Sequence, residues 1–298
     1  MNFENIREDF SDIPVLIYLG GEGKRIENLA YKYILPSKQW LPIGFDENNK
    51  PIPLFWPNFE ILLQLGLKEF YFVVTKDGEK VKEYFKKEFK DRNVNIQLLN
   101  KENLLKATKF EGVNIFIFES NEEGTGDQIL ALKSAIKNRV FLRIYGDEYF
   151  GWEIEKVKKE IRLFIDYSLE KIKKEKAVEV FAFIDEKIAI GSIWKGLSIA
   201  GNKQSGKIIK TTKSNFVITS MGLASPEFFD ILQSKKKNSI PLDVASPEIV
   251  KRIIESQRAY GKVIDVEVFS NVNTPDDYYR LVSYYNERIR ENLKIKVK

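Results

Sequence analysis

The sequence predicts an α/β fold in which a mostly parallel sheet carries helices on both faces and is joined to a small β-rich subregion. The first supporting observation is an unbroken apolar run at residues 13–19, which is typical of a strand buried on both faces. The second is the alternation of strand-like and helix-like segments over about the first 180 residues. The third is a change after that point to short strand-like runs with glycine-containing turns, which favours hairpins.

Each segment is assigned from its own pattern. Helices are expected where apolar residues recur at three- and four-residue spacing, as at Val81, Tyr84, Phe85 and Phe89. In the first half the expected strands are residues 13–19, 70–75, 94–99, 113–119 and 140–145, and the expected helices are 57–65, 78–89, 127–137 and 153–174. In the second half the expected strands are 178–184, 188–194, 207–209, 216–223 and 263–269, and the expected helices are 226–232, 247–260 and one from Pro275 onward. The sequence has no repeat and no long linker, so we expect a single domain.

The chain of 298 residues contains no cysteine and no histidine. This excludes disulfides, thiolate nucleophiles, cysteine-based metal sites and histidine-dependent catalytic triads. An enzyme of this composition would have to use carboxylates, lysine, arginine, amides and backbone N–H groups, with a hard metal ion such as Mg²⁺ bound through oxygen. Such chemistry points toward phosphate-containing substrates.

The net charge is +5, but residues 286–298 carry five basic and two acidic residues and therefore supply three of those charges. We expect a solvated basic tail there rather than a nucleic-acid-binding arm. No apolar run approaches the roughly 18 residues of a membrane span, and the acidic first residues are unlike a signal peptide. These features favour a cytoplasmic protein without nucleic-acid or membrane partners, and they leave a homo-oligomer open.

A glycine-rich loop, Gly20-Gly21-Glu22-Gly23-Lys24-Arg25, follows the first expected strand. Consecutive glycines let the backbone approach a ligand, and their N–H groups can form an anion-binding nest. Lys24 and Arg25 would add positive charge for a phosphate. The loop matches neither the Walker nor the dinucleotide pattern, and a tight strand-to-helix turn with surface charges would explain it equally well on its own.

Two further motifs have both a functional and a structural interpretation. Lys38 lies between two prolines in an apolar stretch, which would hold it rigidly with its ammonium aimed at a ligand. The alternative is an ordinary surface lysine. The Gly124-Thr125-Gly126 turn precedes an expected helix, whose N-terminus favours anions. The alternative there is capping by Thr125 or Asp127.

Two oxygen-bearing sites complete the set. Asp147 ends the expected strand 140–145, where open α/β sheets bind ligands, and its carboxylate suits Mg²⁺. A turn aspartate that bonds its own backbone is the alternative. Asn271 and Asn273 precede the helix that begins at Pro275, and either could cap that helix or offer an amide oxygen to a metal ion.

In order and spacing, these five motifs resemble those of the sugar-1-phosphate nucleotidyltransferases, or nucleotide-sugar pyrophosphorylases. That family reads L-A-G-G-x-G-T-R-L, P-K-x-L-L-P, G-T-A and G-D, followed by a late acidic or Asn metal ligand. The matching segments are 18–26, 38–42, 124–126, 146–147 and Asn273. The resemblance covers about residues 13–285. It implies one Rossmann-like three-layer domain of the nucleotide-diphospho-sugar transferase type, with nucleotide binding in about 1–150, sugar-phosphate binding in about 151–285 and the basic tail at 286–298.

The resemblance also implies a reaction, the Mg²⁺-dependent transfer of a nucleotidyl group from an NTP to a sugar-1-phosphate, which yields an NDP-sugar and pyrophosphate. Arg25 and Lys38 would be catalytic, and Asp147 and Asn273 would hold Mg²⁺. The implied nucleotide-binding residues are Leu19, Gly20, Gly21, Gly23, Lys24, Gly124 and Thr125, and the implied sugar-phosphate-binding residues are Lys213 and Gly222.

Some positions depart from the family pattern. Lys24 replaces the threonine of G-T-R-L, Ser37 replaces a proline, and the Glu-Lys-Pro sugar-phosphate motif is missing, with Lys213 the nearest lysine and Lys210 a rival. Two alternatives therefore stay open: a noncatalytic nucleotide-binding or regulatory paralogue, and a glycosyltransferase that uses a nucleotide sugar. The motifs do not identify the base or the sugar.

Overall fold

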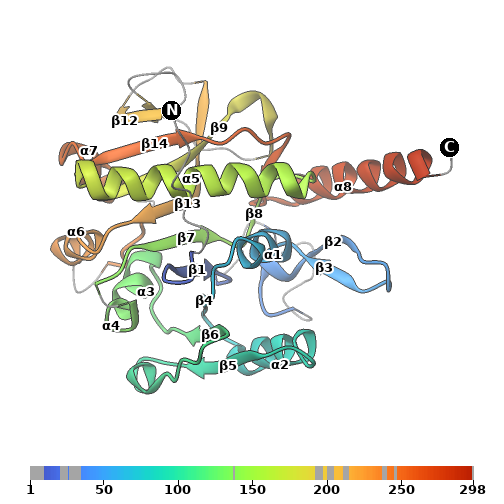
Figure 1. The fold of residues 1–298 in the computed structure, drawn as a ribbon, viewed down its shortest axis with the longest axis horizontal. Helices are drawn as coiled ribbons and strands as arrows, with labels where there is room; N and C mark the ends of the chain where they lie inside the picture. Colours follow the sequence, from blue (N-terminus) through green and yellow to red (C-terminus); the bar gives the residue numbers. More distant parts are fainter. Residues whose placement is uncertain are drawn as a thin grey trace.

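A large twisted sheet forms the centre of the protein in a computed structural model (Figure 1). The structure describes residues 10–20, 26, 35–136, 138–191, 197–199, 205–210, 215–236, 240–244 and 247–296. Within them the central sheet has ten strands in the order β11-β12-β14-β9-β13-β7-β1-β4-β6-β5. This mixed α/β architecture confirms the predicted fold class.

One half of the central sheet is fully parallel. Its strands are β1 (Pro14–Tyr18), β4 (Glu69–Val74), β5 (Val94–Leu99), β6 (Val113–Glu119) and β7 (Phe141–Tyr145). Every residue of β1 is buried, because helices cover both faces of the sheet. The parallel arrangement brings the carboxyl ends of these five strands to one edge, where open sheets bind ligands.

A hydrophobic cluster lies on each face of the central sheet, between the sheet and the helices that cover that face. Val15 and Ile17 of β1 point into the cluster that contains side chains of α1 (Trp56–Gln64), α2 (Gly78–Glu88) and α5 (Ile154–Glu175). Leu16 and Tyr18 point to the opposite face, which is covered by α3 (Thr125–Ala131), α4 (Lys133–Ile136), α6 (Phe228–Lys235) and α7 (Pro247–Glu255). The period-two alternation of β1 thus divides the core into two layers.

The β-rich second half mainly extends the central sheet. Its strands are β9 (Glu179–Asp185), β11 (Leu197–Ile199), β12 (Ser205–Lys210), β13 (Phe216–Ala224) and β14 (Ala259–Val263). Strand β13 is antiparallel to both β7 and β9 and joins the two halves. Its register shifts between Ile218 and Gly222, which marks a bulge beside the carboxyl end of β7.

Two small sheets and a long helix lie beside the carboxyl edge of the parallel strands. One sheet contains β8 (Glu148–Tyr149), β10 (Ala189–Gly191) and β15 (Phe269–Asn271), and the other pairs β2 (Pro42–Phe45) with β3 (Pro51–Pro53). Helix α8 (Pro275–Lys296) packs against β2 and β10, then runs past the rest of the fold toward the C-terminus (Figure 1). Among the residues that the structure describes, short 3₁₀ turns lie at Lys38–Trp40, Leu104–Lys106 and Glu186–Ile188.

Several predicted boundaries were wrong. The strand expected at 263–269 is replaced by β14, which ends at Val263, and by β15, which begins at Phe269. Val266 and Val268 are buried in hydrophobic clusters without belonging to a strand, so their alternation reflects packing rather than strand pairing. The helix expected to reach residue 260 ends at Glu255. The helix expected from Pro275 onward is present as α8, which runs to Lys296, and the solvated character of the basic stretch 286–298 stays a prediction.

Candidate functional site

The loops after β1 and β7 leave the sheet side by side. The two strands are parallel neighbours with Tyr18 opposite Tyr145, and the Gly146 N–H donates to the Tyr18 carbonyl at 3.0 Å. A Cβ at Gly146 would lie 2.7 Å from the Leu19 side chain and 3.0 Å from the Tyr18 carbonyl oxygen, so a larger residue would require its neighbours to shift. The predicted residues Leu19, Gly20 and Asp147 are therefore brought together at the edge where the parallel strands end.

Lys38 is buried against this edge. Its ammonium donates to Asp147 Oδ2 at 2.6 Å, to the Val272 carbonyl at 2.8 Å and to Asn273 Oδ1 at 3.4 Å. Only 11% of its side chain is exposed, which excludes the surface-lysine alternative. The structure thus joins three of the predicted site residues, which come from widely separated parts of the chain.

The 3₁₀ turn that carries Lys38 is held by its neighbours. Trp40 packs edge-on against Phe55 and Tyr84, with ring centroids 5.0 and 4.6 Å away. Gln39 donates from Nε2 to the Gly20 carbonyl at 3.4 Å, and only 2% of this residue is exposed. The turn is therefore tied both to the aromatic core and to the loop after β1.

Asn273 owes its orientation to the start of α8. The Thr274 hydroxyl accepts from the Asp277 N–H at 3.2 Å, while Asp277 Oδ2 accepts from the Asn273 and Thr274 N–H groups at 3.0 and 2.8 Å. This reciprocal capping box begins the helix, so neither asparagine caps it. Asn273 instead donates from Nδ2 to Asn271 Oδ1 at 2.9 Å, which leaves Asn273 Oδ1 facing Lys38.

The oxygens at this edge fit a magnesium ion held jointly with substrate phosphates. Asp147 Oδ1 is buried and has no hydrogen-bond partner among the residues described, although Oδ2 of the same carboxylate binds Lys38. Together with Asn273 Oδ1 it forms a hard, all-oxygen donor set. In the described part of the chain no group of three or more acidic side chains forms a metal cage, and Mg²⁺ commonly needs only one or two protein carboxylates beside phosphate oxygens.

A buried polar network of Glu148, Ser220 and the Tyr145 backbone lies next to Asp147. Glu148 accepts from the Ser220 N–H at 2.7 Å and from the Ser220 hydroxyl at 2.6 Å, and Ser220 Oγ accepts from the Tyr145 N–H at 2.8 Å. Burial, assisted by the adjacent charge of Asp147, raises the pKa of Glu148 to about 8 despite the bonds from Ser220. The network fixes the bulge of β13 against the end of β7.

Gly222 faces this interior network. Arg143 donates from Nε to Glu179 Oε1 at 2.6 Å and from Nη1 to the Ser220 carbonyl at 2.6 Å, and both charged side chains are buried. A Cβ at Gly222 would lie 2.6 Å from Glu179 Oε1. The absence of a side chain at Gly222 therefore makes room for a buried ion pair, while its predicted contact with a sugar stays a prediction.

The Gly124-Thr125-Gly126 turn is covered by residues 240–244. The Gly126 N–H donates to the Leu242 carbonyl at 2.7 Å, and the Thr125 hydroxyl donates to Asp243 at 2.7 Å and accepts from the Val244 N–H at 3.1 Å. Asp127 accepts from the Leu242 N–H at 2.8 Å. Both glycines allow this close approach, so the glycine pattern has a structural cause here, and the nucleotide contacts of Gly124 and Thr125 stay predictions.

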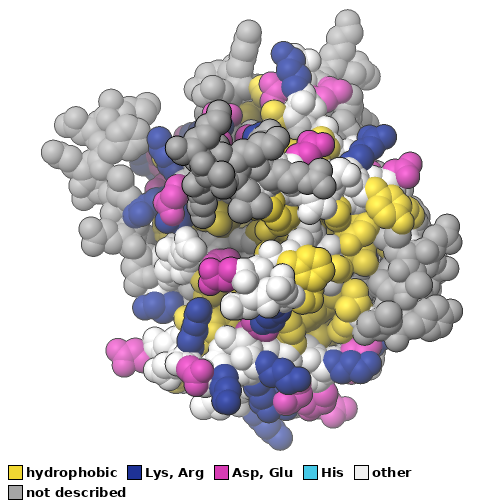
Figure 2. Space-filling model, turned by 90° about the vertical axis from the view of Figure 1, so that its right-hand side faces the viewer, with side chains coloured by type: hydrophobic (Ala, Val, Ile, Leu, Met, Phe, Trp, Pro, Cys, Tyr) yellow, Lys and Arg dark blue, Asp and Glu magenta, His cyan; other side chains and the backbone are white. Residues whose placement is uncertain are grey.

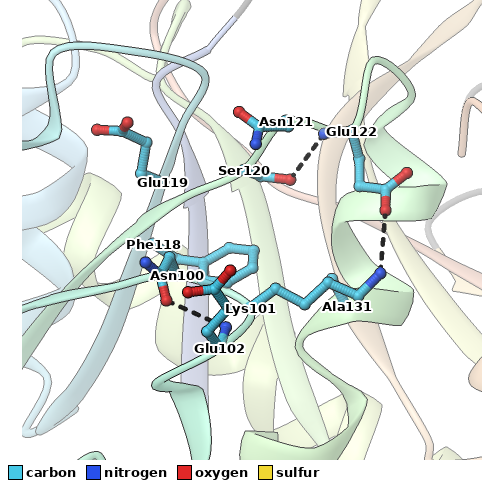
Figure 3. Close-up of a pocket in the computed structure, with 9 residues that line it drawn as sticks. All are labelled: Asn100, Lys101, Glu102, Phe118, Glu119, Ser120, Asn121, Glu122 and Ala131. Carbon is cyan, nitrogen blue, oxygen red and sulfur yellow. Dashed lines mark hydrogen bonds and ion pairs between the residues drawn. The ribbon is translucent and has the colours of Figure 1, made fainter.

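A small pocket of about 130 Å³ lies farther along the same edge, after β5 and β6 (Figure 3). Lys101 reaches across it to Glu122, with 3.7 Å between the charged atoms, and Ser120 accepts from the Glu122 N–H at 3.2 Å. Glu119 accepts from the first N–H of α2 at 2.8 Å. The polar groups of this pocket largely satisfy one another, and none of the predicted site residues lines it.

Five predicted site residues lie outside the described residues: Gly21, Gly23, Lys24, Arg25 and Lys213. Conversely, sequence reasoning missed Gln39, Glu148, Ser220 and Asp243 as parts of the site's surroundings. Gln39 and Glu148 carry a signal in the sequence, because each directly follows a predicted site residue. Ser220 and Asp243 have no such signal, since their contacts depend on pairing between distant segments.

The surface carries mixed charge. On the face toward which α8 and the β2–β3 hairpin project, hydrophobic side chains gather in the middle, with basic and acidic side chains interspersed around them (Figure 2). No helix in the described ranges has the length and apolarity required to cross a bilayer.

Comparison with solved structures identifies the class of fold. No family model matches the chain, and no curated protein matches its sequence. The fold is nevertheless shared with solved sugar-phosphate nucleotidyltransferases, as the resemblance in the motifs predicted.

Three structures illustrate this. UDP-glucose pyrophosphorylase in complex with UDP-glucose aligns over 93% of this chain and 99% of its own, with a TM-score of 0.64 and 16% identity. A Bacillus anthracis protein assigned as a glucose-1-phosphate thymidylyltransferase, solved with sucrose, aligns over 91% and 94% with a TM-score of 0.62 and 14% identity. The inositol-1-phosphate CTP transferase of T. maritima aligns over 92% and 96% with a TM-score of 0.59 and 12% identity. At these identities the similarity concerns the fold, and the substrates are those of the other proteins.

Proposed function

We propose that this protein transfers a nucleotidyl group from a nucleoside triphosphate to a sugar-1-phosphate, releasing pyrophosphate. The observation that carries the proposal is the convergence of Lys38, Asp147 and Asn273 beside the loop after β1, where the Lys38 ammonium lies within hydrogen-bond distance of both other side chains. A buried cation, a carboxylate and an amide oxygen at the carboxyl edge of a parallel sheet suit the binding of a metal–phosphate complex. The shared fold with sugar-phosphate nucleotidyltransferases supports the same reaction class.

The reaction needs no general base. A phosphate monoester has a second pKa of about 6, so an oxygen of the sugar-1-phosphate is already anionic at neutral pH. That oxygen forms a bond to the α-phosphorus as the bond from the α-phosphorus to the bridging oxygen of the β-phosphate breaks. Pyrophosphate leaves with the electron pair. Catalysis then consists of positioning and of neutralising phosphate charge, which agrees with a chain that has no histidine or cysteine.

The chain's own residues would divide this work. The backbone of Leu19 and Gly20 would line the base and phosphates, and Lys38 would neutralise the α-phosphate while Arg25 holds the β- and γ-phosphates. Asp147 Oδ1 and Asn273 Oδ1 would hold Mg²⁺, which when bound neutralises phosphate charge and orients the triphosphate. Lys213 and Gly222 remain the proposed contacts to the sugar phosphate.

Pyrophosphate release tests the proposal directly. The protein is incubated with Mg²⁺, each of the common NTPs in turn and a panel of sugar-1-phosphates, and pyrophosphate and NDP-sugar are measured. At least one pair should turn over, and Asp147→Ala should lower the rate by at least a hundredfold. Glu83→Ala, which removes an exposed carboxylate on α2, is the matched control and should leave the rate unchanged.

The remaining outcomes separate the alternatives. Nucleotide binding without turnover for every pair would favour a regulatory protein. Sugar transfer from a nucleotide sugar without pyrophosphate would favour a glycosyltransferase. Normal turnover by Asp147→Ala would place the metal site elsewhere.

A further inference from the structure

The ammonium of Lys38 contacts both oxygen-bearing side chains assigned to the metal. It lies 2.6 Å from Asp147 Oδ2 and 3.4 Å from Asn273 Oδ1, and a third bond to the Val272 carbonyl at 2.8 Å uses its remaining donor capacity. Lysine carries three donors and no acceptor, so all of its hydrogen-bonding capacity is directed into this corner of the site. The Lys38 ammonium therefore already neutralises the charge of the Asp147 carboxylate.

This arrangement works against a free divalent cation. Asp147 and Lys38 together are formally neutral, and both are about nine-tenths buried. A divalent ion that approached Asp147 would meet an ammonium within a few ångströms, in surroundings where charges are poorly screened. A metal ion bound at the unpartnered Oδ1 would share the single negative charge of Asp147 with Lys38, and giving up the 2.6 Å bond to Oδ2 would leave the ammonium buried without its counter-ion.

We infer that Lys38 is a resident counter-cation that excludes free Mg²⁺ from the site and yields Asp147 only when a triphosphate arrives with the metal. A metal–triphosphate complex is negative overall, so it offers the ammonium a new anionic partner as it takes the carboxylate. Lys38 moves from Asp147 to a phosphate oxygen, and Asp147 and Asn273 become free to bind the metal. This inference rests on the proposed function for its choice of ligand, and it adds an order of binding that the proposed function does not require.

Metal binding alone tests the inference, without any turnover. Mn²⁺ is used as the probe, and its affinity is measured by calorimetry and by the loss of free-ion electron paramagnetic resonance, with and without a non-hydrolysable NTP analogue. The wild-type protein should bind Mn²⁺ at least tenfold more weakly without the analogue than with it. Lys38→Met, which keeps the stem and removes the charge, should bind Mn²⁺ alone at least tenfold more tightly than wild type.

Two further variants locate the effect. Adding Asp147→Asn to Lys38→Met should abolish the gain, because the Asp147 carboxylate that has lost its ammonium partner is the source of the gain. Lys86→Met removes another lysine that pairs with a carboxylate, Glu83, but on the exposed surface of α2, and it should bind Mn²⁺ like wild type. Should Lys38→Met fail to fold, Lys38→Gln, which is also uncharged, takes its place, because the triphosphate chelates Mn²⁺ by itself and the wild-type comparison alone does not isolate Lys38.

Wild-type protein that binds Mn²⁺ equally well with and without analogue would overturn the inference, as would a Lys38→Met protein with no gain. These outcomes are independent of the activity assay. Turnover combined with tight binding of free Mn²⁺ would remove the inference and keep the proposed function. A gain in Lys38→Met without any turnover would keep the inference and remove the proposed function.

Discussion

At the scale of single residues, the site depends on one buried lysine whose ammonium contacts a carboxylate and an amide oxygen. The prolines around Lys38 indicated a rigid lysine, and the position of Asp147 after a buried strand indicated a carboxylate at the ligand-binding edge. Lys38 and Asn273 are 235 positions apart, so no local pattern could have paired them. The same limit explains why Ser220, which joins Glu148 to the end of β7, was missed.

Glu148 makes a residue-scale prediction about pH. Its pKa is about 8 in the folded protein and about 4.5 when unfolded, so the folded state retains a proton that the unfolded state releases between these values. Its contribution to stability is fully present below about pH 4.5 and is lost as pH rises through about 8. The side chain of Glu148→Gln is neutral at every pH. The free energy of unfolding of this variant, relative to that of wild type, should therefore increase by about 1–3 kcal/mol from pH 5 to pH 8.

Urea unfolding at pH 5, 6.5 and 8 with EDTA present measures this difference. Glu83→Gln, which changes an exposed carboxylate, is the control and should follow the wild-type curve over this range. Parallel curves for wild type and Glu148→Gln would contradict the assignment.

At the scale of elements, segments with a strong local pattern were predicted well. The apolar run of β1 and the amphipathic faces of α2 and α5 appear close to their expected limits, because burial on a defined face sets them. Elements that depend on pairing with distant segments were predicted poorly. Strand β14 pairs with β9, about eighty residues earlier in the chain. The hairpin of β2 and β3 was not predicted, because both strands are short and prolines stand at their ends.

The cover over the turn at 124–126 gives an element-scale prediction. A Cβ at Gly124 would meet the backbone of Leu242, with its carbonyl carbon 2.6 Å away, and backbone cannot rotate aside as a side chain can. Gly124→Ala should therefore lift residues 240–244 from α3 and cost about 1–3 kcal/mol. Hydrogen exchange resolved by peptide should show faster exchange over 240–244.

Thr125→Val is the matched comparison, because it removes the hydroxyl bonds to Asp243 and Val244 without a steric clash. It should speed exchange over the same peptide less than Gly124→Ala does. Unchanged exchange in Gly124→Ala would show that the cover does not depend on this contact.

At the scale of the whole molecule, the two edges of the parallel sheet carry charge in different ways. At the carboxyl edge, Asp147 keeps one oxygen without a partner among the described residues, and Glu148 is held with a raised pKa. At the amino edge, Glu69 at the start of β4 binds Arg139 through two bonds of 2.7 Å, Lys109 at 2.6 Å and the Tyr71 hydroxyl at 2.8 Å. Glu69 is thus bonded through both carboxylate oxygens at the edge away from the site, whereas Asp147 keeps one oxygen available at the site itself.

The last prediction separates these two edges. Burial alone would raise the pKa of Glu69, but the bonds from Arg139 and Lys109 outweigh it and lower that pKa. A lowered pKa gives stability that is present above the unfolded value and is lost as pH falls through the folded value. Arg139→Met should cost about 1–3 kcal/mol at pH 7, since Lys109 and Tyr71 still bind the carboxylate, and should flatten the loss of stability toward acid pH. Because Arg139 lies at the amino edge, KM and kcat at permissive temperature should not change. Urea unfolding midpoints measured over a series of acidic pH values test the change in stability, and steady-state kinetics test KM and kcat. A change in KM without a change in stability would show that the two edges are coupled.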